Sequence, residues 1–473
     1  MFAKPRTRPR RFRWWPFAAG APILIAAAVA AASPGVAPRP PLGWNSWDAY
    51  GFTLDEAQFK ANAALLARWR GWHGAYAVID EGWYMADPLG KDVPARRYRL
   101  DGFGRLQPVP ERFPSAAGGG GLKALADWTH AQGLRFGIHV VRGIPKAAVA
   151  ANMPIAGSAY HAADAADRAA PCPWDQGNDG IADNAAGQAY YDAMVREYAA
   201  WGVDFLKVDC IADHPYRPTE IRQLGLAIRR AGRPMVLSLS PGPADPAHAD
   251  EMAASAQMWR ISDDFWDGWT FPHPNPASSF PSGVLDQFDR VARWSLLSGP
   301  NRWADADMLP FGQLSPHPGW GDPRASRLSP AEVRTTFVLW AIARSPLILG
   351  GDLTRLDAAT RALVTNPALL ALDQEARTGR AIGARPGLPA AVRLWTSAPS
   401  GRAVDTVAVF NTGDAALSLD MPWRELDLDR GAYAATDLIA GRALPSSARL
   451  IVSVPAHDVA LLRVRPNGPG RGH

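Results

Sequence analysis

The sequence predicts a (β/α)8 TIM barrel followed by a C-terminal antiparallel β-sandwich. From about residue 40 to residue 365, eight short apolar runs alternate with helical stretches. After about residue 380, only short β-like runs remain. Eight strands that alternate with helices are typical of a closed parallel barrel. We therefore expect the barrel over residues 40–375 and the sandwich over residues 380–466.

The eight barrel strands are predicted from short apolar runs that end in or near polar residues. In chain order they are LGWNSW (42–47), YAVIDEGW (76–83), LRFGIHVV (134–141), VDFLKVDC (203–210), PMVLSLSP (234–241), QMWRISDD (257–264), RWADADML (302–309) and SPLILGGDL (345–353). Amphipathic stretches such as DEAQFKANAALLARWRGW (55–72) and AAGQAYYDAMVREYAAWG (185–202) lie between them and predict the helices.

The C-terminal part has a different pattern. Its β-like runs are AAVRLWTS (390–397), TVAVFNTG (406–413), LSLDM (417–421), GAYAATDLI (431–439) and DVALLRVRP (458–466). Turn residues separate these runs, and no long helical pattern interrupts them. Short strands joined by turns are typical of an antiparallel β-sandwich.

The N-terminal segment has the composition of a secretory signal. Six basic residues lie within residues 1–13, an apolar stretch follows, and small residues end it near Ala32. We expect residues 1–32 to be a signal peptide that directs export to the periplasm or the medium; an uncleaved anchor is the alternative. Removing these six charges takes the net charge from +5 to −1. Without a basic surface, nucleic acid is disfavoured as a partner.

The chain has two cysteines, Cys172 and Cys210. In an oxidising compartment they allow one disulfide. Two thiols alone do not complete a four-ligand zinc site, and the sequence contains no HExxH or CxxC motif. We therefore expect neither a metal nor a cofactor.

Polar residues cluster at the C-terminal ends of the predicted barrel strands, where barrel enzymes place their catalytic groups. They are Asp48, Asp80, Glu81, His139, Arg142, Lys207, Asp209, Ser240, Arg260, Asp263, Asp264, Asp305 and Asp307. A single residue of this kind most often belongs to a structural salt bridge. In a ring of acids, however, the negative charges would repel one another and lower the stability of the fold. Such an arrangement is explained only if the acids have a function. We therefore expect an enzyme.

Aromatic residues near these acids indicate the class of substrate. The chain has nineteen tryptophans, of which Trp44, Trp47, Trp83, Trp259, Trp266 and Trp269 lie close to the acids in sequence. Paired carboxylates beside aromatic faces that stack on sugars are typical of glycoside hydrolysis. Lys207, two residues before Asp209 on one strand, would keep that carboxylate ionised, as a nucleophile requires. A non-catalytic carbohydrate-binding protein is the alternative from another class.

The chain resembles glycoside hydrolase family 27, the α-galactosidase and α-N-acetylgalactosaminidase family. The stretches that carry the resemblance are PPLGWNSWDAYG, VIDEGW, GLRFGIH, WGVDFLKVDC, MWRISDDF, ADADML and SPLILGGDL, within residues 40–353. The resemblance implies that Asp209 is the nucleophile and Asp264 the acid/base of a retaining double displacement, with Asp263 as the rival for the second role.

The same resemblance implies further contacts around the sugar. They come from Trp44 at the pocket floor, from Asp80, Lys207 and Arg260, and from Asp307 near the acid/base. Members of the family often have a disulfide near the nucleophile, which implies a bond between Cys210 and Cys172. A free Cys172 that lines the pocket is the alternative.

Several positions depart from the family pattern, and three of them leave the sugar open. Glu81 replaces the second of two adjacent aspartates, His139 replaces a tyrosine, and Ser240 replaces a glutamate. The longer acid at Glu81 would crowd the hydroxyls that distinguish galactose, whereas Ser240 leaves room for a bulkier 2-substituent. We expect a retaining, exo-acting α-galactosidase. The alternatives are an α-N-acetylgalactosaminidase, a β-L-arabinopyranosidase or another α-glycosidase.

Overall fold

The computed structural model describes Met1 and residues 35–89, 97–273, 278–315, 322–399 and 403–467. Apart from Met1, the predicted signal peptide lies outside these ranges. The contacts from Gly35 to the C-terminus form one compact unit. Within the described ranges, no helix is both long and apolar enough to span a bilayer.

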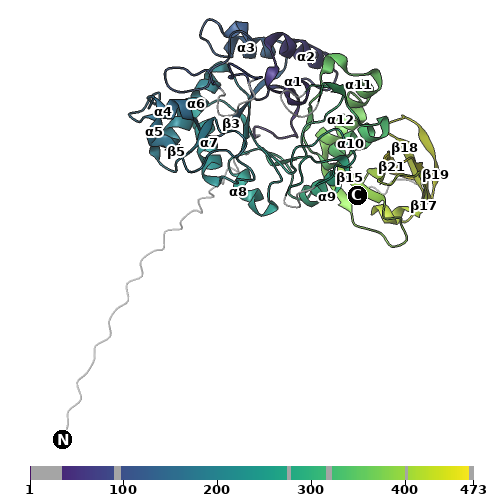
Figure 1. Ribbon diagram of the computed structural model, residues 1–473. Coiled ribbons are helices and arrows are strands. Elements are labelled where there is room, and N and C mark those ends of the chain that lie inside the picture. The colour runs from purple at the N-terminus through teal and green to yellow at the C-terminus, as the bar shows by residue number, and fades with distance from the viewer. Residues whose placement is uncertain (2–34, 90–96, 274–277, 316–321, 400–402, 468–473) are drawn as a thin grey trace, which may run out of the picture. The chain divides into compact units, whose positions relative to one another are not determined.

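Eight parallel strands form the central sheet (Figure 1). They are β1 (Leu42–Asn45), β2 (Tyr76–Ile79), β3 (Arg135–Val141), β7 (Phe205–Asp209), β8 (Val236–Leu239), β9 (Met258–Arg260), β10 (Trp303–Asp305) and β13 (Leu347–Leu349). Their order is β10-β9-β8-β7-β3-β2-β1-β13. A parallel bridge between Leu309, just after β10, and Leu349 in β13 joins the two ends of the sheet. The predicted barrel is confirmed, and each strand lies within one of the eight predicted runs.

Helices follow the barrel strands, and most of them cover the outside of the barrel. They are α1 (Trp47–Tyr50), α2 (Glu56–Arg68), α3 (Lys123–Ala131), α6 (Ala185–Trp201), α7 (Pro218–Ala231), α8 (Ala249–Ala253), α9 (Val284–Trp294), α10 (Pro330–Ala343), α11 (Ala358–Val364) and α12 (Pro367–Glu375). Local sequence sets several of their ends. Asp55 and Gln58 form a capping box at the start of α2, and Gly202 ends α6 in the left-handed conformation.

The long connection from β3 to α6 has structure of its own. It contains β4 (Ile144–Pro145), α4 (Lys146–Ala150), α5 (Ala162–Ala165), β5 (Ala166–Asp167) and β6 (Asn178–Ile181). The three strands pair in the antiparallel order β4-β6-β5. In Figure 1, α4, α5 and β5 lie together beside α6. The disulfide between Cys172 and Cys210 ties this connection to the C-terminal end of β7, so the connection can supply residues to the barrel mouth.

The C-terminal domain is the predicted antiparallel β-sandwich. A six-stranded sheet has the order β14-β15-β16-β21-β18-β19, and β17 pairs with β20. The strands are β14 (Ala376–Ile382), β15 (Val392–Pro399), β16 (Thr406–Asn411), β17 (Leu417–Pro422), β18 (Tyr433–Asp437), β19 (Ala443–Ser447), β20 (Arg449–Val454) and β21 (Val459–Pro466). Inward residues such as Val407, Met421 and Leu450 form its core. Helix α10 contacts this domain, because Thr335 Oγ1 donates to His457 O at 2.7 Å.

Candidate active site

A cavity of about 490 Å³ opens at the C-terminal ends of the barrel strands. It is lined by Trp47, Phe52, Asp80, Glu81, His139, Trp174, Lys207, Asp209, His214, Ser240, Pro241, Arg260, Asp263, Asp264, Ser278, Phe280 and Met308. The barrel therefore brings together most of the residues that the sequence analysis placed at the site. Trp44 and Asp307 do not line this cavity.

Trp44 was expected at the pocket floor, and this prediction is wrong. Side chains alternate along β1, so that Asn45 points into the barrel while Trp44 points outward. The Trp44 ring packs against Phe59 of α2 at a centroid distance of 6.1 Å, and its Nε1 donates to Gly351 O at 2.8 Å. Trp47, in the helical turn after β1, lines the cavity instead.

Most of the other tryptophans that lie close to the acids in sequence do not line the cavity either. Trp83 packs against Trp201, Trp259 against Trp294, and the Trp269 ring stacks on His457. None of these residues lines the cavity, and neither does Trp266. Most of the tryptophans near the acids therefore stabilise the core, where a large apolar side chain gains the most from burial.

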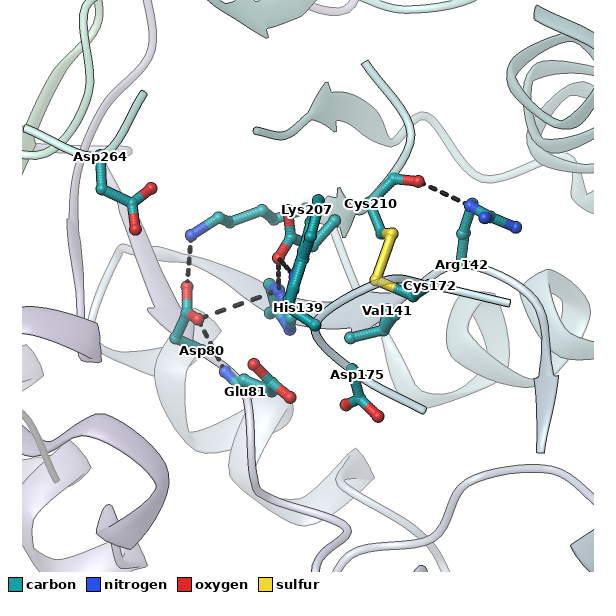
Figure 2. A network of polar contacts seen from close by, with 12 residues as sticks. Asp80, Glu81, His139, Val141, Arg142, Cys172, Asp175, Lys207, Cys210 and Asp264 are labelled. Atoms are coloured by element: carbon teal, nitrogen blue, oxygen red, sulfur yellow. Dashed lines mark hydrogen bonds and ion pairs between the residues drawn. A yellow bond between two sulfur atoms is a disulfide. The ribbon is translucent and has the colours of Figure 1, made fainter. Parts of the chain in front are cut away.

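The buried end of the cavity is built around Asp80 (Figure 2). Asp80 Oδ2 accepts hydrogen bonds from Lys207 Nζ at 2.8 Å and from Asn45 Nδ2 at 2.7 Å. The Glu81 backbone N–H donates to Asp80 Oδ1 at 2.8 Å. Burial alone would raise the pKa of Asp80, but Lys207, His139 and these hydrogen bonds hold that pKa well below its usual range.

Lys207 was expected to act on Asp209, its neighbour on the same strand. Its hydrogen-bonded ion pair is instead with Asp80, which follows β2. The side chains of Lys207 and Asp80 both point into the barrel interior, where residues of different strands meet. Burial lowers the pKa of Lys207, but the attraction of Asp80 and nearby acids raises it overall, so the ammonium stays charged. Lys207 therefore presents a fixed cation beside the nucleophile candidate while it holds Asp80 in place.

Asp209 ends β7 and is partly exposed to the cavity. Its Oδ2 lies 4.0 Å from His139 Nε2 and accepts a long hydrogen bond from Trp174 Nε1 at 3.4 Å. His139 Nε2 is also 4.0 Å from Asp80 Oδ1. Burial lowers the pKa of His139 below its ordinary value, although the nearby carboxylates of Asp80 and Asp209 oppose this shift. The carboxylate of Asp209 is thus held by weak contacts and is accessible to a ligand.

Asp264 and Asp307 share the guanidinium of Arg260. Arg260 Nη2 donates to Asp264 Oδ1 at 3.1 Å, and Arg260 Nη1 lies 2.8 Å from Asp307 Oδ1. The Phe265 backbone N–H donates to Asp307 Oδ2 at 2.8 Å. Asp307 is buried beside a smaller inner cavity of about 20 Å³ rather than at the main cavity. It therefore positions Arg260 and the chain after Asp264.

The rival acid, Asp263, has different contacts. Its Oδ2 accepts hydrogen bonds from Ser279 Oγ at 2.6 Å and from Ser279 N at 3.0 Å. The side chain of Asp263 is 7% exposed, whereas that of Asp264 is 37% exposed. An acid/base must reach both a leaving group and water. These contacts favour Asp264 over Asp263 for that role.

Three of the positions that depart from the family pattern line the cavity: Glu81, His139 and Ser240. His139 Nδ1 and Ser240 Oγ are buried and have no hydrogen-bond partner among the described residues. A buried polar atom without a partner is costly unless a ligand or water satisfies it. These atoms are therefore available to bind hydroxyl groups.

A disulfide joins Cys172 to Cys210, the residue directly after Asp209 (Figure 2). Cys172 is therefore disulfide-bonded, as the resemblance implied, and is not a free thiol that lines the pocket. Arg142 braces the same region, since its Nε donates to Cys210 O at 2.6 Å and its Nη2 donates to Pro171 O at 3.2 Å. Within the ranges that the structure describes, no cluster of three or more His, Cys, Asp or Glu residues could hold a metal ion.

Comparisons with known proteins agree with this geometry. The family model described as "Alpha galactosidase A" matches residues 173–375, and the "Alpha galactosidase C-terminal beta sandwich domain" matches residues 390–464. The crystal structure of a GH27 β-L-arabinopyranosidase from Geobacillus stearothermophilus is 38% identical, with a TM-score of 0.84. That match covers 92% of this chain and 98% of the other. The chain belongs to glycoside hydrolase family 27.

Two curated relatives carry other activities of the family 27 enzymes. Alpha-galactosidase A of Cellvibrio japonicus is 28% identical over 448 residues, which cover 91% of this chain and 93% of the relative. Alpha-N-acetylgalactosaminidase of Gallus gallus is 26% identical over 359 residues, 72% of this chain and 71% of the relative. As a family 27 member, the protein is a glycosidase.

Sequence reasoning did not assign several residues of this family 27 site, among them Asn45, Trp174 and His214. Asn45 could have been found from alternation along LGWN, because it is the polar residue on the inward face of β1. Trp174 and His214 come from loops whose course the sequence does not reveal. His214 lies 3.7 Å from Asp263 through its Nε2 and Oδ1 atoms, and so joins two loops of the cavity rim.

Proposed function

We propose that the protein is a retaining, exo-acting glycosidase that removes a terminal sugar with the ring configuration of galactose. We propose β-L-arabinopyranosides as the preferred substrates and α-D-galactosides as the second. The observation that carries the preference is Glu81, which lines the cavity beside the Asp80–Lys207 pair. The cavity at the barrel mouth, with charged side chains at its buried end, supports removal of terminal units.

The proposed reaction has two steps. In the first, a carboxylate oxygen of Asp209 attacks the anomeric carbon, the glycosidic C–O bond breaks, and Asp264 gives its proton to the leaving oxygen. In the second, the Asp264 carboxylate takes a proton from water, the water oxygen attacks the anomeric carbon, and the bond to Asp209 breaks. Two inversions give net retention. The contacts of Asp264 and its exposure support this division of roles.

The choice of sugar follows from the size of one side chain. β-L-Arabinopyranose has the ring hydroxyls of α-D-galactose but lacks the hydroxymethyl group. Asp80, held by Lys207, is placed to accept hydrogen bonds from ring hydroxyls. Glu81 is one methylene longer than the aspartate that the family usually has, and a longer acid leaves less space for a hydroxymethyl group. The match to a β-L-arabinopyranosidase supports this choice.

α-D-Galactosides are the second candidate because the matching family models and the Cellvibrio japonicus relative bear that name. A panel of p-nitrophenyl glycosides tests both candidates: the β-L-arabinopyranoside, α-D-galactoside, α-N-acetylgalactosaminide and α-D-glucoside. We expect the highest kcat/KM for the β-L-arabinopyranoside and the next highest for the α-D-galactoside. Turnover of neither would overturn the proposal, and binding of both sugars without turnover would favour a carbohydrate-binding protein.

We also propose that the protein is exported. Stable disulfides form mainly in oxidising compartments, and the Cys172–Cys210 bond is consistent with that setting. The intact mass of protein recovered from the periplasm or medium should correspond to cleavage near Ala32. A mass that includes residues 1–32 would favour an anchor instead.

A further inference from the structure

The cavity changes character from its buried end to its rim. Lys207, Asp80 and Arg260 are charged side chains that are almost fully enclosed by the barrel. The rim instead carries Trp174, which is 37% exposed, and His214, whose side chain is 50% exposed. The buried, charged end suits the hydroxyls of the sugar that is cleaved off. The aromatic rim must therefore face whatever is attached to that sugar.

Two anchors hold Trp174 in its exposed position. On one side, the disulfide fixes Cys172 to Cys210. On the other side, Asp175 Oδ1 accepts hydrogen bonds from Tyr98 Oη and from Gly177 N, both at 2.8 Å. An exposed tryptophan gains little from burial, so nothing in the packing of the core requires an indole here. The chain nevertheless fixes this ring at the mouth of the cavity.

The ring lies between the nucleophile and a second aromatic residue. Trp174 Nε1 is 3.4 Å from Asp209 Oδ2, and the ring centroid is 5.5 Å from that of His214, with an interplanar angle of 57°. His214 Nδ1 lies 2.9 Å from Asp213 Oδ2, which fixes the imidazole. Trp174 therefore adjoins the nucleophile, and His214, whose Nε2 lies 3.7 Å from Asp263 Oδ1, lies beside the residue that precedes Asp264.

We propose that Trp174 and His214 form a subsite for the leaving group, in which the indole face of Trp174 stacks on the pyranose ring of the departing saccharide. This inference rests on the proposed hydrolysis and adds the substrate class on the leaving side: a glycoside whose aglycone is itself a sugar. The apolar C–H face of a pyranose matches an indole face. The imidazole of His214 can exchange hydrogen bonds with the hydroxyls of that ring.

The test compares two substrates that differ only in their leaving groups. α-D-Galactosyl fluoride releases fluoride, which cannot stack, whereas melibiose releases glucose. We expect Trp174→Ala to lower kcat/KM for melibiose about tenfold or more, which is the scale of one lost stacking contact. For the fluoride, Trp174→Ala should lower kcat/KM no more than Trp174→Phe does, because both variants lack the N–H that reaches Asp209 and fluoride has no ring to stack.

Matched variants separate stacking from other effects. Trp174→Phe retains an aromatic face but lacks the N–H that reaches Asp209, so it should recover most of the activity on melibiose. Phe103→Ala removes another exposed aromatic residue that does not line the cavity, and both substrates should be unaffected. Thermal melting of each variant checks that the fold is intact.

Three results would overturn the inference. An equal loss on both substrates in Trp174→Ala would mean that the indole acts through Asp209 and not on the leaving group. Unchanged activity on melibiose would mean that the indole does not contact the leaving sugar. If the wild type hydrolyses neither α-D-galactosyl fluoride nor β-L-arabinopyranosyl fluoride, the proposed function fails together with the subsite.

Discussion

Shortening Glu81 to aspartate should change the sugar preference. The substitution withdraws the carboxyl group by about 1.5 Å, the length of one carbon–carbon bond. A difference of one methylene in a binding pocket is worth about 1–3 kcal/mol, or about 10- to 200-fold in kcat/KM. Glu81 lines the cavity next to Asp80, whose position is fixed by Lys207 and Asn45. Because Asp80 is fixed, it does not move into the space that the shorter side chain of Glu81→Asp leaves.

The assay is the ratio of kcat/KM for the p-nitrophenyl β-L-arabinopyranoside to that for the α-D-galactoside. In Glu81→Asp this ratio should fall by about tenfold or more toward the galactoside. Glu81→Gln is the matched control, because it keeps the length of the side chain and should keep the preference for the pentoside. The reasoning is refuted if Glu81→Gln shifts the ratio as much as Glu81→Asp, or if neither variant changes it.

Three further predictions concern the acids and the disulfide. Asp264→Ala should retain activity only on substrates with good leaving groups. Added azide should raise the activity of this variant and give a glycosyl azide with the anomeric configuration of the substrate. If azide instead rescues Asp263→Ala, Asp263 and not Asp264 is the acid/base. Replacing Cys172 and Cys210 by alanine should lower the free energy of unfolding in urea by about 3–4 kcal/mol, because the bond closes a loop with a sequence separation of 38. The pKa of Asp80 is lower in the folded than in the unfolded state, so its carboxylate stabilises the fold above about pH 4 and loses that effect as the pH falls. The difference in unfolding free energy between the wild type and Asp80→Asn should thus be largest at pH 5–7 and should shrink below pH 4.

The barrel could be predicted from the sequence because its strands are buried apolar runs with helices between them. The sandwich strands β14, β19 and β20 were not predicted. The sequences of β14 and β19 do not look like strands, whereas β20 (RLIVSV) is a β-branched apolar run that could have been predicted. β14 contains Gly379, where a Cβ atom would lie 1.6 Å from Ile342 O, so that only glycine lets this strand approach α10 so closely. β19 is short, mostly exposed and contains Pro445. Tertiary contacts outweigh local propensity at these strands.

The site could be predicted as far as it depends on strand ends. Carboxyl ends of parallel strands meet at one face of a barrel, which is why Asp80, Asp209 and Asp264 were expected together. Which acid would pair with Lys207 could not be predicted, since the partner lies on another strand across the barrel interior. Trp174 was missed for a related reason: only the fold of the β3–α6 connection brings it to Asp209.

The anomeric configuration of the first product tests the central claim most directly. Hydrolysis of the best substrate can be followed by proton NMR in the first minutes, before the released sugar mutarotates. Double displacement through Asp209 and Asp264 predicts that the first sugar to appear has the configuration of the substrate. A first product of the opposite configuration would mean that water attacks the anomeric carbon directly, and it would contradict the role of Asp209 as a nucleophile.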